Sequence, residues 1–139
     1  MSLLPRKGLL AIAAVIDVAL NGRDSPVPAR KLAARHKLPP RHLEPVLQSL
    51  VHAGIFLGVR GPRGGYALAR ERKRISVADI LRAADAVEDD ATGAAGGSRI
   101  LSESVLPAVA QAERAFMAAL ARLNVEDIAR RAEALQDPA

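Results

Sequence analysis

The chain has 139 residues, half of them hydrophobic but only 2% aromatic, with 20 Lys/Arg, 15 Asp/Glu and no cysteine. This length fits one domain with an appended segment, the Ala- and Leu-rich composition favours helices, and the absence of cysteine excludes disulfides and cysteine-ligated metal or iron–sulfur sites. No apolar stretch reaches the roughly 18 residues of a membrane span or ends in a signal-peptide cleavage site, so we expect a cytoplasmic protein without a membrane partner.

The charge is divided unevenly along the chain. Residues 1–75 hold 14 Lys/Arg and 4 Asp/Glu, a balance of +10, whereas residues 76–139 hold 6 and 11, a balance of −5. A basic front half is typical of a surface that binds a polyanion. An Arg-rich background composition is the alternative, but it does not explain why the sign reverses midway. The division favours nucleic acid as a partner.

The first predicted helix spans residues 6–21 and is apolar nearly all round, ending at Asn21-Gly22. A helix without a polar face is buried on both sides, so it can pack on its own domain and on a partner. Asp17 lies within it. We expect this carboxylate to bond to a neighbouring backbone group or arginine and not to be catalytic.

The next two predicted helices, residues 29–36 and 41–53, are separated by a short break and form a helix-turn-helix. The second has an apolar face and a polar face. The apolar face consists of Leu43, Val46, Leu47, Leu50 and Val51, and the polar face of Arg41, Glu44, Pro45, Gln48 and His52. Side chains of Arg, Gln and Glu read base edges in the major groove, so Arg41, Glu44 and Gln48 are candidate base contacts. His42 is a candidate phosphate contact; an ordinary solvated helix face is the alternative for the whole set.

Two short strands, predicted at residues 55–59 and 66–69, flank a Gly/Pro/Arg tip, which makes this segment the wing of a winged helix. Arg60 and Arg63 at the tip suit a narrow minor groove, where the potential is strongly negative. We also place Tyr66 in the predicted DNA-binding surface, and basic residues 70–74 at phosphates. The tip matches neither a dinucleotide fingerprint nor a P-loop, so a nucleotide cradle is discounted.

The acidic half begins with a predicted helix at residues 76–86, opened by a capping box of Ser76 and Asp79. A mobile loop, a long helix from about residue 104 to 123 with Pro107 in its first turn, and a short helix at residues 125–135 follow. Apolar positions of the long helix recur at spacings of four and three, as in a coiled-coil seam. This predicted dimerisation seam contains Val105, Val109, Ala112, Phe116, Leu120 and Leu123. A core helix within one chain is the alternative.

The motif Arg60-Gly61-Pro62-Arg63-Gly64-Gly65-Tyr66 resembles the wing of the Rrf-two family of bacterial transcription regulators. The resemblance continues through residues 7–8, 17–20, 42–44, 50–54 and 75–80, and weakly through 123–128. It implies a homodimer in which the long helix crosses its mate, base contact by Glu44, and an Arg60 side chain in the minor groove. Cluster-binding members of the family carry three cysteines before the long helix, whereas residues 90–99 here contain none, so we expect no iron–sulfur cofactor.

Together these features predict a mainly α fold: a winged helix-turn-helix domain with a two-stranded β wing (residues 1–86), a flexible loop (87–103), and a long dimerisation helix with a short C-terminal helix (104–139). We expect a sequence-specific regulator, a repressor, that binds a palindromic operator in double-stranded DNA as a homodimer. A winged-helix protein-interaction module without DNA binding is the alternative. The chain has no nucleophile–base pair and no metal-ligand spacing, so we do not expect an enzyme. A small-molecule or protein effector, acting at the loop or the seam, is left unidentified.

Overall fold

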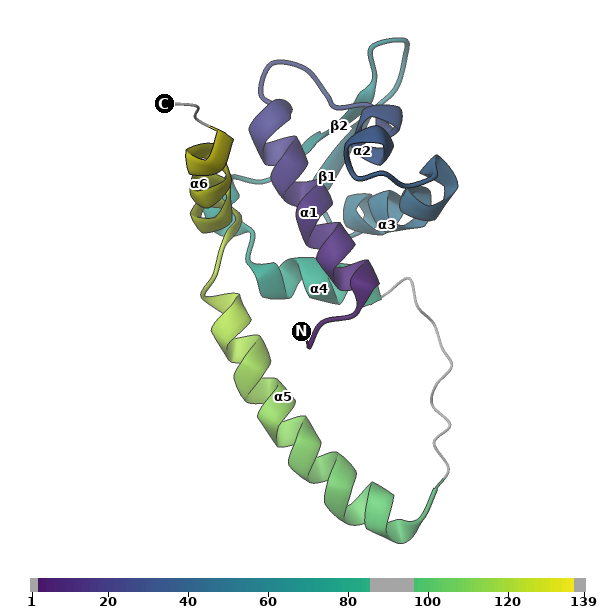
Figure 1. Cartoon of the computed structure of the whole chain (residues 1–139), viewed down its shortest axis with the longest axis vertical. Coiled ribbons are helices and arrows are strands. Elements are labelled where there is room, and N and C mark those ends of the chain that lie inside the picture. Colours follow the sequence, from purple (N-terminus) through teal and green to yellow (C-terminus); the bar gives the residue numbers. More distant parts are fainter. Residues whose placement is uncertain (1–2, 86–96, 137–139) are drawn as a thin grey trace.

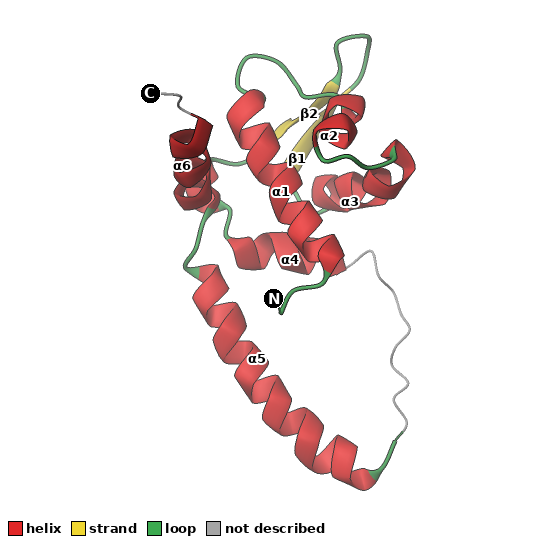
Figure 2. Cartoon of the chain, viewed as in Figure 1, coloured by secondary structure: helices red, strands yellow, loops and turns green. Residues whose placement is uncertain are grey.

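The computed structural model describes residues 3–85 and 97–136. Helices α1 (Arg6–Asn21), α2 (Ala29–Arg35) and α3 (Pro40–His52) precede strands β1 (Phe56–Val59) and β2 (Gly65–Leu68). A 3-10 turn η1 (Arg72–Arg74), helix α4 (Val77–Asp85), a π-helical turn η2 (Leu101–Val105), and helices α5 (Leu106–Ala121) and α6 (Val125–Gln136) follow. This order and the two-stranded antiparallel sheet confirm the predicted mainly helical winged-helix fold (Figure 2).

Helix α1 lies at the centre of the winged-helix domain, with α3, α4, α6 and β2 packed around it (Figure 1). Its C-terminal half is buried, as the apolar sequence predicts, but Leu9 near its start is 42% exposed. The fully buried side chains of the core come from six different elements or their flanks, and they include Val15, Leu32, Leu43, Leu47, Leu50, Ile55, Phe56, Ile75, Ile80 and Val125. Burial of these apolar groups is the main source of stability of such a domain.

The wing is a hairpin in which Phe56 pairs with Leu68 and Val59 with Gly65. It is joined to the rest of the domain by a bridge between Val27 and Tyr66, with both backbone N–H···O distances at 2.9 Å. Val27 stands just before α2, so this bridge fixes the wing to the start of the helix-turn-helix.

The capping box that opens α4 is confirmed. Asp79 N–H donates to the Ser76 hydroxyl at 3.0 Å, and Ser76 N–H donates to the Asp79 carboxylate at 3.1 Å. The two donors at the helix start are thereby satisfied within the motif itself.

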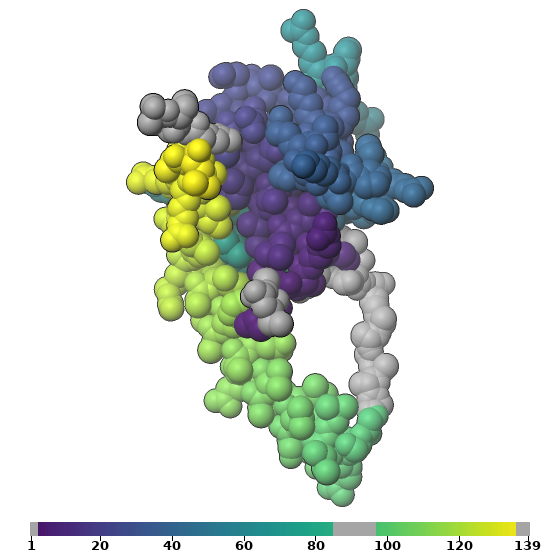
Figure 3. Space-filling model, viewed as in Figure 1, coloured from purple at the N-terminus to yellow at the C-terminus, as the bar shows by residue number. Residues whose placement is uncertain are grey.

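The long helix begins differently from the prediction. Helical turns start before residue 104, and the turn η2 is π-helical before α5 begins at Leu106. Pro107, which has no N–H to donate, is the second residue of α5 and follows this wider turn by two positions. Helix α5 projects away from the winged-helix domain, and no residue of α5 is buried (Figure 3).

Helix α6 returns to the winged-helix domain. Val77 N–H donates to Leu123 O at 2.8 Å, Val125 N–H donates to Ile75 O at 2.9 Å, and Val125 is fully buried in the core. The last helix of the predicted segment 104–139 therefore packs on the domain predicted for residues 1–86. The predicted flexible loop lies outside the described residues as far as residue 96. Among the described helices, none is both long and apolar enough to cross a membrane.

Candidate nucleic-acid interface

Helix α3 has the two faces that the sequence predicts. Its N-cap is Pro39 and its first residue is Pro40, which fits a position where a backbone N–H has no helical partner. The apolar side chains that lie against the core are Leu43, Val46, Leu47 and Leu50. The polar side chains Arg41, His42, Glu44, Gln48 and His52 are all exposed. Arg41, Glu44 and Gln48 share one side of the helix because they are three and four residues apart.

The turn between α2 and α3 sets the orientation of α3. Lys37 N–H donates to Ala34 O at 3.2 Å and Leu38 N–H donates to Ala33 O at 2.9 Å, which is the double bond of a Schellman motif. Lys37 takes the left-handed conformation that this motif requires, with φ of 54°. Glycine is the usual residue at such a position, so the turn carries backbone strain.

Asp17 of α1 fixes the end of α2. Arg35 donates to both carboxylate oxygens, at 2.8 and 2.7 Å, and Asn21 donates to one of them at 3.0 Å. His36 Nε2 lies 3.1 Å from the same carboxylate. The expected pairing of Asp17 with an arginine is thus confirmed.

Burial of Asp17 pushes the pKa of its carboxyl upward, but the hydrogen bonds from Arg35 and Asn21 and the positive charges of Arg35 and His36 outweigh this effect. The net pKa of Asp17 lies below its usual value. The carboxylate therefore stays charged and holds α1 to the helix-turn-helix at neutral pH.

Glycines make the wing tight. A Cβ at Gly65, where φ is 155°, would overlap the backbone carbonyl group of Val27. Because Gly65 has no side chain, the two backbones can approach closely enough to form the bridge between Val27 and Tyr66. Arg60 and Arg63 at the tip are exposed and form no ion pair with any residue that the structure describes.

Tyr66 connects the wing with α3. Its ring packs against the buried Phe56 with ring centroids 5.7 Å apart, and its hydroxyl oxygen accepts a long hydrogen bond of 3.5 Å from Gln48 Nε2. The half-buried Tyr66 therefore has a structural contact as well as a place on the predicted surface. A hollow of about 680 Å³ separates the base of the wing from α3, and Gln48, Arg60 and Tyr66 line it.

The structure adds two basic residues of α1 to the candidate interface, and the predicted surface on α3 and the wing did not include them. A hollow of about 390 Å³ brings Arg6 and Lys7, at the start of α1, together with His42 at the start of α3. These residues are separated by 35 or more positions along the chain, so no spacing in the sequence indicates that they meet.

One predicted phosphate contact is wrong. Arg72 is only 16% exposed because its guanidinium bonds within the chain, to Glu126 at 3.3 Å, to Glu133 at 3.5 Å and to the Ala19 carbonyl at 3.3 Å. Arg72 therefore fastens α6 to the domain. No local pattern indicates this pairing, since Glu126 lies 54 positions away in the chain.

Some residues of the predicted dimerisation seam are exposed to solvent, and others pack against the same chain. Val105, Val109, Ala112 and Leu123 are exposed, whereas Phe116 and Leu120 are half-buried. Val109, Ala112 and Phe116 line an apolar groove of about 550 Å³ together with Leu3, Leu4, Pro5 and Leu81.

Over residues 4–131 the sequence matches Rrf2, a family described as iron-dependent transcriptional regulators. The chain belongs to the Rrf2 family. It is a DNA-binding transcriptional regulator, and the family consists of regulators and not of enzymes. The resemblance seen in the wing motif is confirmed.

Curated relatives agree with this assignment. The Rrf2 chain is 31% identical over 137 residues to the HTH-type transcriptional regulator IscR of Xenorhabdus nematophila, covering 95% of this chain and 82% of that protein. It is 34% identical over 107 residues to IscR of Yersinia pseudotuberculosis, covering 73% of this chain and 65% of that protein.

Solved structures also resemble the Rrf2 chain. IscR of T. potens superposes with a TM-score of 0.73 at 29% identity, covering 98% of this chain and 92% of that one. CymR, the global cysteine regulator of B. subtilis, superposes with a TM-score of 0.69 at 22% identity, covering 94% and 98%. The second likeness concerns the fold alone.

The Rrf2 family description includes iron, but the residues of this chain do not fit a cysteine-ligated cluster, because the sequence has no cysteine. Within residues 3–85 and 97–136, no group of three or more His, Asp and Glu side chains could hold a metal ion.

Proposed function

We propose that this regulator binds a palindromic DNA operator as a homodimer, with α3 in the major groove and the wing in the adjacent minor groove. The observation that carries the proposal is the arrangement of Arg41, Glu44 and Gln48, which are exposed on one side of α3, with Gln48 lining the hollow that faces the base of the wing. A duplex that lies along α3 meets Arg60 and Arg63 of the wing as its minor groove turns towards the protein.

In this proposal, the side chains of α3 divide the work of recognition. Arg41 donates to guanine, Gln48 to adenine, and Glu44 accepts from the amino group of cytosine. His42, together with Arg6 and Lys7 at the hollow beside it, contacts phosphates, which position the protein without reading sequence. Tyr66 contributes to the surface while it holds Gln48 from the side of the wing.

The exposed face of α5 supports the homodimer. Val105, Leu106 and Val109 are 43 to 47% exposed on a helix that projects from its own domain (Figure 3). A second copy of α5 would cover this apolar strip and fill the groove beside Val109 and Phe116. A two-fold dimer places its two α3 helices on one side of the duplex and so requires an inverted repeat.

We infer that the bound dimer represses transcription by occupying its operator, and that it does so without a cysteine-ligated iron–sulfur cluster. The signal that releases it is a small molecule or a partner protein. Transcription from a promoter that contains the operator, with and without the purified regulator, tests the direction of control.

Selection of DNA from a random pool, followed by titrations with single variants, tests the proposed contacts. Glu44→Ala should relax the preference at one base pair of each half-site by about tenfold, because one base contact discriminates by about 1–3 kcal/mol. Arg60→Ala should weaken binding to the selected site by about tenfold. Arg131→Ala, an exposed position on α6 at the far side of α1, is the matched control and should leave affinity unchanged.

If Glu44→Ala and Arg60→Ala both bind the selected DNA with the wild-type affinity and preference, the assignment of the site is wrong. If the selection enriches no inverted repeat, the proposal of a two-fold complex is wrong.

A further inference from the structure

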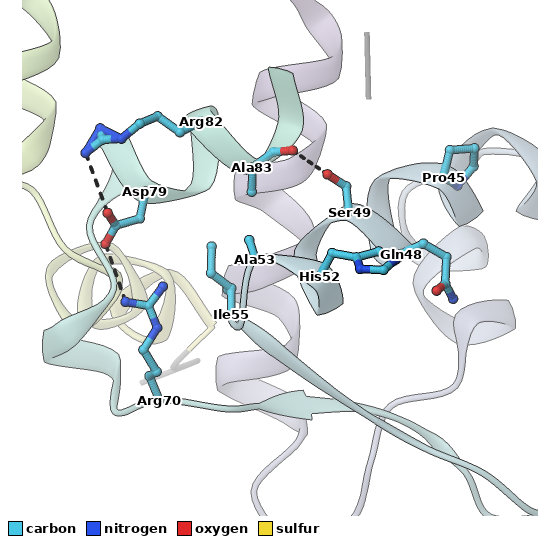
Figure 4. A pocket seen from close by; sticks show the side chains of 10 residues that line it. All are labelled: Pro45, Gln48, Ser49, His52, Ala53, Ile55, Arg70, Asp79, Arg82 and Ala83. Atoms are coloured by element: carbon cyan, nitrogen blue, oxygen red, sulfur yellow. Dashed lines mark hydrogen bonds and ion pairs between the residues drawn. The ribbon is translucent and has the colours of Figure 1, made fainter. Parts of the chain in front are cut away.

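A further cavity, of about 640 Å³, lies between the C-terminal half of α3 and helix α4 (Figure 4). Gln48 and His52 of α3 lie on one side of it, and Asp79 and Arg82 of α4 lie on the other, with Arg70 from the segment after β2. Apart from Gln48, none of its lining residues belongs to the hollow beside the wing.

The polar wall of this cavity has an excess of positive charge. Arg70 and Arg82 both approach the Asp79 carboxylate, but only to 3.8 and 3.7 Å, which are long distances for ion pairs. Arg82 is 60% exposed and makes no shorter polar contact with the described residues. Two guanidinium groups thus share one carboxylate. Arg70 also donates to the Gly54 and Arg74 carbonyls, both at 3.3 Å, so it is the guanidinium of Arg82 that can bind an additional anion.

The floor of the cavity is apolar. Ile55 and Ala83 lie buried beneath it, and the exposed Pro45 and Ala53 supply the apolar surface that a ligand can contact. A volume of this size is typical of small-molecule sites and exceeds what one phosphate group fills. Ligand sites of proteins commonly combine such an apolar floor with a few polar groups that fix the orientation.

We propose that the α3–α4 cavity binds a small organic anion, a carboxylate or phosphate ester with an apolar body. The anionic group pairs with Arg82 in competition with Asp79, with Arg70 beside it, and the apolar body rests on the exposed Pro45 and Ala53. A phosphate of bound DNA has the same anionic chemistry, but it has no apolar body to cover this floor.

The position of the cavity connects its occupant with DNA binding, a step that rests on the function proposed above. One wall is the helix that we assign to the major groove, and the Ser49 hydroxyl donates a hydrogen bond to the Ala83 carbonyl between the two walls. A molecule that contacts both helices changes their relative position or rigidity. By linkage, the anion changes the affinity for DNA by the same factor as DNA changes the affinity for the anion.

The test is a calorimetric titration of the full chain, without DNA, with phenyl phosphate, inorganic phosphate and the neutral benzyl alcohol. Phenyl phosphate should bind most tightly, because only this probe has both the charge and the ring. Arg82→Gln should weaken its binding by about tenfold or more, since a charge-assisted contact is lost. Arg131→Gln, an exposed arginine on α6, should bind phenyl phosphate as the wild type does.

Asp79→Asn provides a second variant with the opposite sign. It removes the competing carboxylate, while the asparagine oxygen still accepts the hydrogen bond from Ser76 N–H that caps α4. Phenyl phosphate should therefore bind this variant more tightly than the wild type. A residue with a merely structural role would not produce an increase.

Equal affinity of phenyl phosphate for the wild type and for Arg82→Gln would overturn the proposal. The proposal would also be overturned if phenyl phosphate did not bind and Arg82→Gln bound DNA more weakly. In that case the anion that Arg82 contacts would be a DNA phosphate. A wild-type chain that binds phenyl phosphate at this site but no DNA would refute the proposed function and retain the cavity as an anion site.

Discussion

Replacing Asp17 by asparagine removes a negative charge from a buried position and keeps the shape of the side chain. The wild-type carboxylate accepts two hydrogen bonds from Arg35, at 2.7 and 2.8 Å, and one from Asn21. A hydrogen bond to a charged group contributes about 1.5–3 kcal/mol, and breaking a fully buried ion pair costs about 3–5 kcal/mol. Because the Arg35 side chain is 42% exposed, solvent screens part of this energy. We expect Asp17→Asn to lower the free energy of unfolding by about 2 kcal/mol at pH 7.

The effect has a defined pH dependence. The folded-state pKa of Asp17 is lowered from the reference value of 3.8, so its stabilisation is present above that pH and is lost as the pH falls through the folded-state pKa. The difference between the wild type and Asp17→Asn should therefore be constant at neutral pH and shrink below about pH 4.

Urea unfolding followed by circular dichroism, at one protein concentration, measures this difference at pH 7, 5 and 3.5. Asp24→Asn, which removes an exposed carboxylate, is the matched control and should change the free energy of unfolding by less than about 0.5 kcal/mol. The reasoning is refuted if Asp17→Asn is as stable as the wild type at pH 7, or if its deficit does not shrink at pH 3.5.

Three other substitutions test the wing, the turn and the seam. Gly65→Ala should open the bridge between Val27 and Tyr66 at a cost of about 3 kcal/mol, seen as faster hydrogen exchange of those two amides and as weaker DNA binding. Gly58→Ala, where a Cβ meets no atom within 4 Å, is the control and should change neither readout. If the two amides stay protected in Gly65→Ala, the account of the wing is contradicted. Lys37→Gly should raise the free energy of unfolding, measured in urea, by about 0.5–1 kcal/mol, because glycine adopts the left-handed conformation without strain. Lys37→Ala also removes the charge but keeps the strain, so it should not raise the free energy of unfolding. An equal increase in both variants would show that the charge is the cause. Val109→Arg should give a monomer in light scattering, because the added charge lies in the proposed interface. Gln111→Arg, on the opposite side of α5, is the control and should stay dimeric. A dimeric Val109→Arg would exclude this seam.

Local chemistry made part of this fold predictable. The spacing of Leu43, Leu47 and Leu50 repeats with the period of a helix, and the structure buries all three. The pair Ser76 and Asp79 caps α4 through bonds between neighbours in the chain, so a four-residue pattern was sufficient to predict it. The glycines between the two strands likewise predicted a tight hairpin.

Contacts between distant segments could not be read in the same way. Arg72 belongs to a basic run, and its burial against Glu126 depends on where α6 returns to the domain. The hydrogen bond from Ser49 to the Ala83 carbonyl and the approach of Lys7 to His42 depend equally on how whole helices pack. Residue type and spacing predict which face of α3 is polar, but only tertiary packing shows that a cavity lies beside it.

Fluorescence anisotropy of the selected inverted-repeat DNA, titrated with the full chain at several salt concentrations, tests the central claim most directly. If α3 and the wing bind DNA as proposed, the wild type should bind this duplex more tightly than a scrambled one, and the logarithm of the affinity should fall steeply with the logarithm of salt, by about 0.9 per phosphate contact. Glu44→Ala should reduce the preference for the selected sequence with little change in that slope. Equal, salt-insensitive affinity for both duplexes, or no binding at low salt, would contradict the account.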